Sequence, residues 1–85
     1  MALIKEVILW NHQGTSDKEY YIGIDHVGPD SFNIIVKYGK RGRIGNYYVF
    51  ANLTTLEGAE RILTSQMRKK LGKGYQVSDK MLDML

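Results

Sequence analysis

The N-terminal half of the chain contains short apolar segments rich in strand-forming residues, and two of them alternate with the period of two that is typical of β-strands. Four such segments are expected, at about residues 3–11, 20–24, 32–38 and 47–51. The polar residues 11–19 predict a loop, and the only proline, Pro29, predicts a turn before the third segment. Because short connections join antiparallel strands, whereas parallel strands need long crossovers, the pattern favours an antiparallel meander.

After residue 53 the apolar residues recur at steps of three and four, which is the spacing of an amphipathic helix. The residues of this stripe are Leu56, Ala59, Leu63, Met67 and Leu71. Thr54 and Glu57 have the spacing of a capping box and predict where the helix begins. Gly72 and Gly74 predict its end.

The predicted fold is therefore α+β, an antiparallel β-sheet of four to five strands with one amphipathic helix packed on it. Residues 75–77 are the candidate fifth strand. The expected core contains Phe32, Ile34, Val36, Leu56, Ala59, Leu63 and Met67. The 85 residues are enough for one domain, and we assign residues 3–77 to its core and residues 78–85 to a C-terminal tail.

The composition excludes several classes of protein. Apolar residues make up 44% of the chain, as in globular domains. The absence of cysteine excludes disulfides, thiolate metal ligands and cysteine nucleophiles. No apolar run approaches the roughly 18 residues that a membrane span needs, and no signal peptide opens the sequence. We therefore expect a soluble cytoplasmic protein that does not bind a membrane.

No catalytic or metal-binding pattern stands out. His12 and His26 lie in predicted loops at a spacing that matches no metal motif. The adjacent Ser16 and Asp17, and the pair Thr54–Thr55, are explained by turn and cap roles. The carboxylates lack the apolar surroundings that separate the pKa values of an acid–base pair. The sequence therefore predicts a protein without catalytic residues, which needs no cofactor and no metal.

Positive charge is concentrated in one part of the chain. The net charge is −3 over residues 1–36, +7 over residues 37–75 and −1 over the last ten residues. Because a uniformly solvated surface mixes its signs, this asymmetry predicts an electrostatic face.

The densest basic stretch is KYGKRGRIGN, residues 37–46, which contains four cations, three glycines and no acid. Gly39 and Gly42 bracket Lys40–Arg41, which predicts a tight turn between the third and fourth strands. In the simplest interpretation, the stretch is a hairpin tip whose charges are solvated.

A second interpretation is that these cations bind an anion. An extended chain projects Arg41 and Arg43 to the same side, and the guanidinium group is well shaped for bidentate phosphate contact. Gly42 and Gly45 beside them let the backbone approach a ligand and offer N–H groups to an anion. The two interpretations stay open at this point.

The helix supplies further positive charge. Lys69, Lys70 and Lys73 lie near its C-terminus, where they either complement the helix dipole or extend an anion-binding surface. Lys70 falls beside the apolar stripe, so we expect its side chain to run past Met67 and Leu71 to reach water.

Three segments in order, FNIIVKYGKRGRIGN, FANLTTLEGAE and KLGKGY, resemble the WGR domain, which is named for its Trp-Gly-Arg motif. The resemblance spans about residues 3–77 and includes the GRIG of Gly42–Gly45. The family occurs in poly(ADP-ribose) polymerases and in bacterial proteins that are little more than the domain itself. The resemblance implies an antiparallel sheet with one helix, and a domain that binds DNA ends.

The resemblance assigns roles to three residues. Gly42 and Arg43 take the positions of the motif Gly and Arg, whereas Arg41 stands where the motif has Trp. The flat apolar platform that the family places against a terminal sugar is therefore missing, but Arg41 retains the ability to stack and to contact phosphate. These 85 residues contain no ADP-ribosyl transferase domain, so we expect that activity to be absent.

The sequence thus leads to the hypothesis of a non-catalytic nucleic-acid-binding module, with DNA favoured over RNA by the resemblance alone. The alternative is a protein-interaction module that uses the same basic surface on an acidic partner. The candidate binding residues are Lys40, Arg41, Arg43, Asn46, Lys69 and Lys73, with Gly42 and Gly45 as structural glycines.

Replacement of Arg43 tests this hypothesis. Arg43→Ala should leave the fold intact, because exposed charges contribute little to stability, and should weaken DNA binding. Arg43→Lys should restore binding poorly, since lysine lacks the bidentate geometry. The measurement is affinity for blunt-ended and circular DNA, and equal affinity of both variants and the parent would contradict the assignment.

Overall fold

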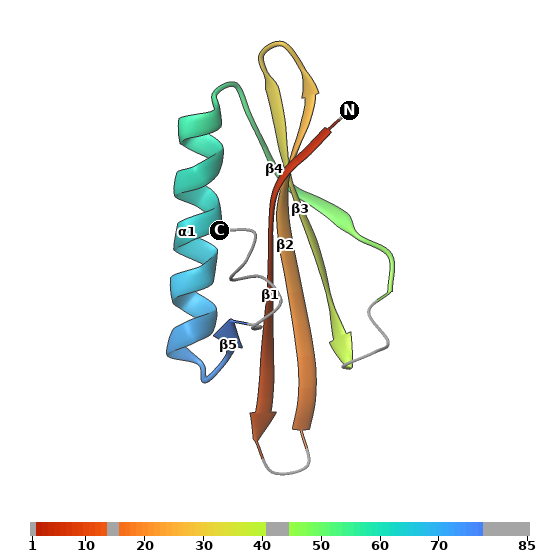
Figure 1. Cartoon of the computed structure of the whole chain (residues 1–85), viewed down its shortest axis with the longest axis vertical. Coiled ribbons are helices and arrows are strands. Elements are labelled where there is room, and N and C mark those ends of the chain that lie inside the picture. Colours follow the sequence, from red (N-terminus) through yellow and green to blue (C-terminus); the bar gives the residue numbers. More distant parts are fainter. Residues whose placement is uncertain (1, 14–15, 41–44, 78–85) are drawn as a thin grey trace.

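The computed structural model describes residues 2–13, 16–40 and 45–77 and confirms the α+β fold. Its elements are β1 (Ala2–Gln13), β2 (Ser16–Gly28), β3 (Ser31–Lys40), β4 (Tyr48–Leu53), α1 (Leu56–Gly72) and β5 (Gln76–Val77). The strands form one antiparallel sheet in the order β4-β3-β2-β1-β5 (Figure 1), so the predicted meander and the short fifth strand are both confirmed.

The first hairpin is longer than the sequence pattern indicates. The predicted loop at residues 11–19 was wrong, because Asn11 pairs with Lys18 and His12 with Asp17 in the continuing β1–β2 ladder. Ladder hydrogen bonds come from the backbone and do not require apolar side chains. Two polar strand ends therefore pair without leaving a hydrophobic signal in the sequence.

The connection between β3 and β4 also differs from the prediction of a tight turn at Lys40–Arg41. Lys40 belongs to β3 and pairs with Lys18 of β2, whereas the pairing of β3 with β4 ends at Val36 and Tyr48. Because β2 accompanies β3 over its whole length, β3 extends four residues past its last ladder pair with β4. Gly39 lies within this extension with φ 156°, which favours glycine.

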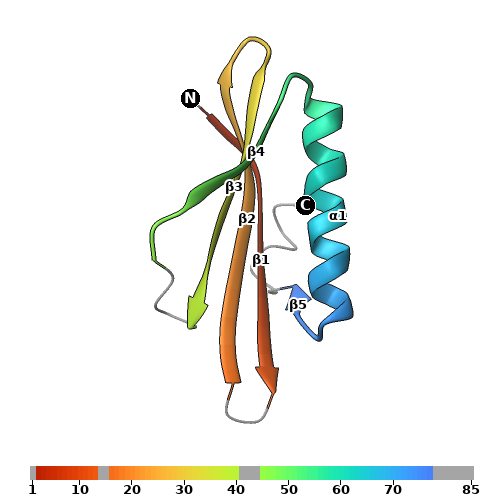
Figure 2. The same cartoon turned by 180° about the vertical axis from the view of Figure 1, so that it is seen from behind.

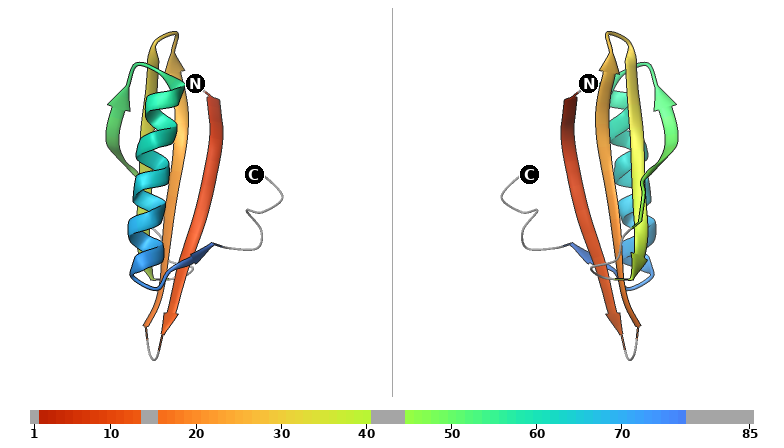
Figure 3. Two further views of the ribbon diagram at one scale, coloured as in Figure 1. Left: turned by 90° about the vertical axis from the view of Figure 1, so that its left-hand side faces the viewer. Right: turned by 90° about the vertical axis from the view of Figure 1, so that its right-hand side faces the viewer.

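The core lies between the sheet and α1, which covers one sheet face (Figure 3, left). Its buried residues are Val7, Leu9, Tyr20, Ile22, Ile24, Phe32, Ile34, Val36, Ala59 and Leu63. The centre of the predicted helical stripe is confirmed, with Met67 partly buried against this core. The core prediction was wrong for Leu56, which is the first residue of α1, one turn before the buried Ala59, and is 40% exposed. Leu71, which the prediction did not place in the core, is 45% exposed.

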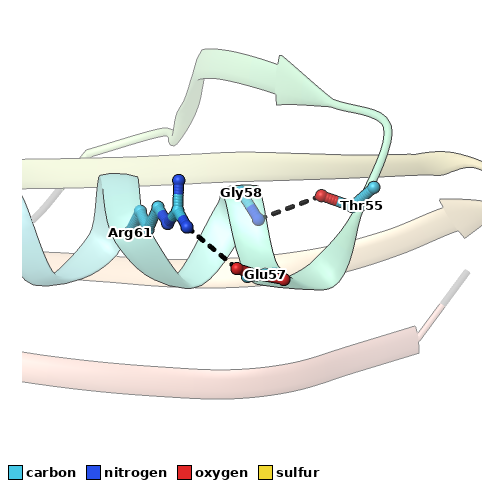
Figure 4. Close-up of polar contacts among 4 residues, drawn as sticks. All are labelled: Thr55, Glu57, Gly58 and Arg61. Carbon is cyan, nitrogen blue, oxygen red and sulfur yellow. Dashed lines mark hydrogen bonds and ion pairs between the residues drawn. The ribbon is translucent and has the colours of Figure 1, made fainter.

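The helix begins one residue later than the capping-box spacing indicates. Thr55, not Thr54, is the N-cap, and its hydroxyl accepts a hydrogen bond from the Gly58 amide at 3.0 Å (Figure 4). Glu57 does not bond back to the cap. Its carboxylate accepts from Arg61 at 2.9 Å, one turn further along the exposed face.

The C-terminus of α1 is fixed by two nested backbone hydrogen bonds. The Tyr75 amide donates to the Lys70 carbonyl at 3.0 Å, and the Gly74 amide donates to the Leu71 carbonyl at 3.1 Å. These are the bonds of a Schellman motif, and Gly74 supplies the positive φ of 97° that it requires. The motif turns the chain back, so that β5 pairs with β1 through Leu9 and Val77.

Truncation of Leu63 tests the position of the helix. Leu63 is 1% exposed in the centre of the core, so Leu63→Ala should lower the free energy of unfolding by about 2–5 kcal/mol. Leu71→Ala is the matched control on the same helix, and its cost should stay below about 0.5 kcal/mol, as for other surface changes. Chemical denaturation measures both, and equal losses would contradict the described packing of α1.

Candidate functional site

Four lysines and three tyrosines gather near the end of α1. In Figure 1 this end of the helix lies toward the lower end of the sheet. They come from the start of β2, the end of β3, the end of α1 and the residues that follow it. We call this group the lysine–tyrosine cluster, and it consists of Lys18, Lys40, Lys70, Lys73, Tyr20, Tyr38 and Tyr75.

The register of β2 and β3 places the strand members of the cluster on the face that α1 covers. Four successive cross-strand pairs on this face are Ile24–Ile34, Ile22–Val36, Tyr20–Tyr38 and Lys18–Lys40. The first two pairs are buried under the helix. Along the same face toward the end of the sheet, the third pair consists of tyrosines and the fourth of lysines. The site is thus an extension of the core face beyond its apolar part.

Lys70 joins the helix to this face. Its ammonium lies 4.6 Å from the centre of the Tyr20 ring and 5.5 Å from that of Tyr75, within the range of cation–π attraction. The two rings meet edge to face at 6.4 Å. The ammonium of Lys70 thus ends over aromatic rings, and the expected path of its side chain past Met67 and Leu71 stays a prediction.

The cluster holds its cations close together. Burial lowers the pKa of Lys70, and repulsion from Lys73 and then from Lys18 lowers it further. Lys18 and Lys40 lie directly opposite each other, an arrangement of like charges that costs stability in a β-ladder. Among the described residues, no carboxylate forms an ion pair with any of these four lysines.

The Tyr20 phenol of the cluster keeps its proton near neutral pH. Burial raises the pKa of Tyr20 to about 12, with smaller contributions from Tyr48 and Tyr75. Tyr20 is therefore a neutral ring that faces the Lys70 ammonium.

The acidic residues of the first two strands lie on the opposite face of the sheet, which no helix covers (Figure 3, right). The register of β1 and β2 places Glu6, Glu19 and Asp25 on this open face. Lys37 is the one described strand lysine found there, where its ammonium lies 5.0 Å from the centre of the Tyr21 ring. The described charges of the strands are thus largely separated by sign between the two sheet faces.

The open face is packed over its middle by its own side chains. The Tyr21 hydroxyl donates to the Glu6 carboxylate at 2.7 Å, and a Cβ on Gly23 would lie 3.0 Å from that hydroxyl oxygen. Gly23 therefore leaves the space in which Tyr21 lies along the sheet. Burial, followed by the hydrogen bond to Glu6, raises the pKa of Tyr21. The described residues place no concentration of positive charge on this face.

The described chain offers no metal centre. No group of three or more His, Asp or Glu residues in residues 2–13, 16–40 and 45–77 could hold an ion. The two histidines lie in strands, not in the loops that the sequence predicts. His12 approaches Asp17 at 3.5 Å, and the His26 ring stacks on Phe32 at 4.5 Å.

The structure brings together some of the predicted binding residues. Lys40 and Lys73 both belong to the lysine–tyrosine cluster. Lys69 does not, because it lies on the outer side of α1 beside Arg68. Asn46 is exposed before β4, and no contact within the described ranges joins it to the cluster.

The remaining predicted residues have different outcomes. Arg41, Gly42 and Arg43 lie outside the described residues. A Cβ on Gly45 would meet open space, so no steric requirement for glycine is found at this position.

Sequence reasoning missed Lys18 and the tyrosines of the cluster. Lys18 has the same parity as Tyr20 and Ile22, so the period of two contains the signal once β2 is known to begin at Ser16. The signal was hidden because residues 11–19 were interpreted as a loop.

Comparison with known proteins gives no independent assignment. No family model, no curated protein and no solved structure matches this chain. In the part of the chain that the structure describes, no helix has the length and apolar character needed to cross a membrane.

Because the lysine ammonium groups lie close together, removal of one of them should change the pKa of another. Lys18→Gln should raise the pKa of Lys70 toward its ordinary value, because one of the two neighbouring ammonium groups is removed. An NMR titration of the Lys70 side chain at alkaline pH measures this shift. Lys37→Gln, on the opposite face, should leave the pKa of Lys70 unchanged. Identical titration of Lys70 in the parent and in Lys18→Gln would contradict the described proximity.

Proposed function

We propose that this protein is a non-catalytic nucleic-acid-binding module that holds the phosphodiester backbone in the lysine–tyrosine cluster. The observation that carries the proposal is the gathering of four lysines, two of them directly opposite each other, with no described carboxylate to pair them. Such a group repels itself in the free protein. A polyanion offsets this repulsion and gains affinity from the release of its counterions.

The kind of ligand follows from the side chains of the site. Lysine is a compact point charge that contacts phosphate without reading bases, so binding should show little preference for sequence. An extended row of anionic groups suits the span from Lys18 and Lys40 on the sheet to Lys70 and Lys73 at the end of α1. The resemblance to the WGR domain favours DNA, and it stays a prediction.

The predicted arginines fit this proposal. Arg41 and Arg43 follow Lys40 in the chain, so the basic stretch of the sequence is continuous with the cluster. They would add bidentate phosphate contacts to the point charges of the lysines.

The salt dependence of binding tests the proposal. With about four phosphate contacts, log K for duplex DNA should fall with log salt at a slope of about −3.5, and Lys40→Gln should reduce the magnitude of this slope by about 0.9. Lys37→Gln is the matched control, because Lys37 lies three residues away on the same strand but on the opposite face.

Three results would count against the proposal. Equal effects of Lys40→Gln and Lys37→Gln on the salt slope would contradict the assignment of the site. Failure of the protein to bind duplex or single-stranded DNA and RNA at low salt would remove the function. Tighter binding of a poly-glutamate peptide than of any nucleic acid would favour the alternative, an acidic protein partner for the same lysines.

A further inference from the structure

The lysine–tyrosine cluster contains a hollow of about 360 Å³. Its lining residues are Lys18, Tyr38, Gly39, Lys40 and Tyr75. This volume is at the lower end of the range, about 300–1,000 Å³, that encloses small molecules, so the hollow suits a single nucleotide unit. It combines two cations with two aromatic rings.

Tyr38 is the most accessible ring in this hollow. It is 62% exposed, although it lies on the same sheet face as the core. The ring is nevertheless held in place, since the Tyr48 ring meets it edge to face at 6.1 Å with an angle of 87°. An aromatic ring that packs against one neighbour and is still largely exposed to water is suited to stacking against a second flat ring.

A single nucleotide can contact the Tyr38 ring and the neighbouring lysines at the same time. Lys40 is two residues from Tyr38 on the same side of β3, and Lys18 faces Lys40 across the ladder. Gly39, between the ring and Lys40, adds no side chain to the hollow. A nucleotide whose base stacks on Tyr38 therefore finds two ammonium groups close to the phosphates on either side of it.

We propose that this hollow binds one unpaired base, so that the nucleic acid held by the cluster is single-stranded at that point. The inference rests on the proposed function and specifies its ligand. A base inside a duplex has both of its faces covered by neighbouring bases and cannot stack on Tyr38. An unpaired base has a free π-face, and stacking of this kind tolerates any base.

The test distinguishes the contribution of the base to the affinity from the contribution of the phosphates. Binding of the full chain to an oligothymidylate is compared with binding to an abasic oligomer of the same length, which carries the same backbone charge. The parent should bind the oligothymidylate about 5- to 150-fold more tightly, the range that stacking of one base on an aromatic ring supplies. Tyr38→Leu should lose most of this difference, whereas Tyr38→Phe should keep it.

Tyr47→Leu is the matched control. Tyr47 is 53% exposed, and Lys37 of the open face lies over its ring, so its loss should leave the preference for bases unchanged. Denaturation curves of all variants check that each is folded.

The possible outcomes are distinct. Equal binding of the two oligomers by the parent would overturn the inference and leave the proposed function standing. A preference for bases that survives in Tyr38→Leu would also overturn it, because another ring would then hold the base. Binding to duplex DNA or RNA but to neither oligomer would overturn the inference alone, whereas binding to no nucleic acid would also contradict the proposed function.

Discussion

The pairing of β2 with β3 is the constraint on which the rest of the structure depends. Its register aligns Ile22 with Val36 in the core and, four residues further along, Lys18 with Lys40 in the lysine–tyrosine cluster. Because side chains alternate between the two faces of a sheet, a slip of one residue would move the core residues to water and the lysines to the open face. The hydrophobic core therefore fixes the position of the charges.

The apolar core and the cationic site lie along one and the same sheet face. Under α1 the face is aliphatic and fully buried, and toward the end of the sheet it becomes aromatic and then cationic. Lys70 completes the transition from the helix, with its ammonium over Tyr20 and its pKa lowered by burial and by its neighbours. The apolar part supplies the free energy of folding, and it keeps in place a group of like charges that would otherwise separate.

The sequence predicts the fold well because its apolar periods are strong. Alternation in the strands and the helical steps from Ala59 to Met67 define the sheet, the helix and their contact. The site was predicted only in part. Lys40 and Lys73 come from visible basic stretches, but Lys18 lies in a polar strand end whose pairing leaves no hydrophobic pattern. Which lysines meet depends on the register and on where α1 ends, and single-sequence patterns do not contain either.

The central claim is that an anionic ligand binds at the cationic end of the helix-covered face and not on the open face. An NMR titration of the labelled protein with single-stranded DNA tests it most directly, because every residue reports separately. The account predicts that the largest shifts occur at Lys18, Lys40 and Lys70, while Glu6, Asp25 and Lys37 of the open face change little. The largest shifts on the open face, or shifts spread evenly over both faces, would contradict it.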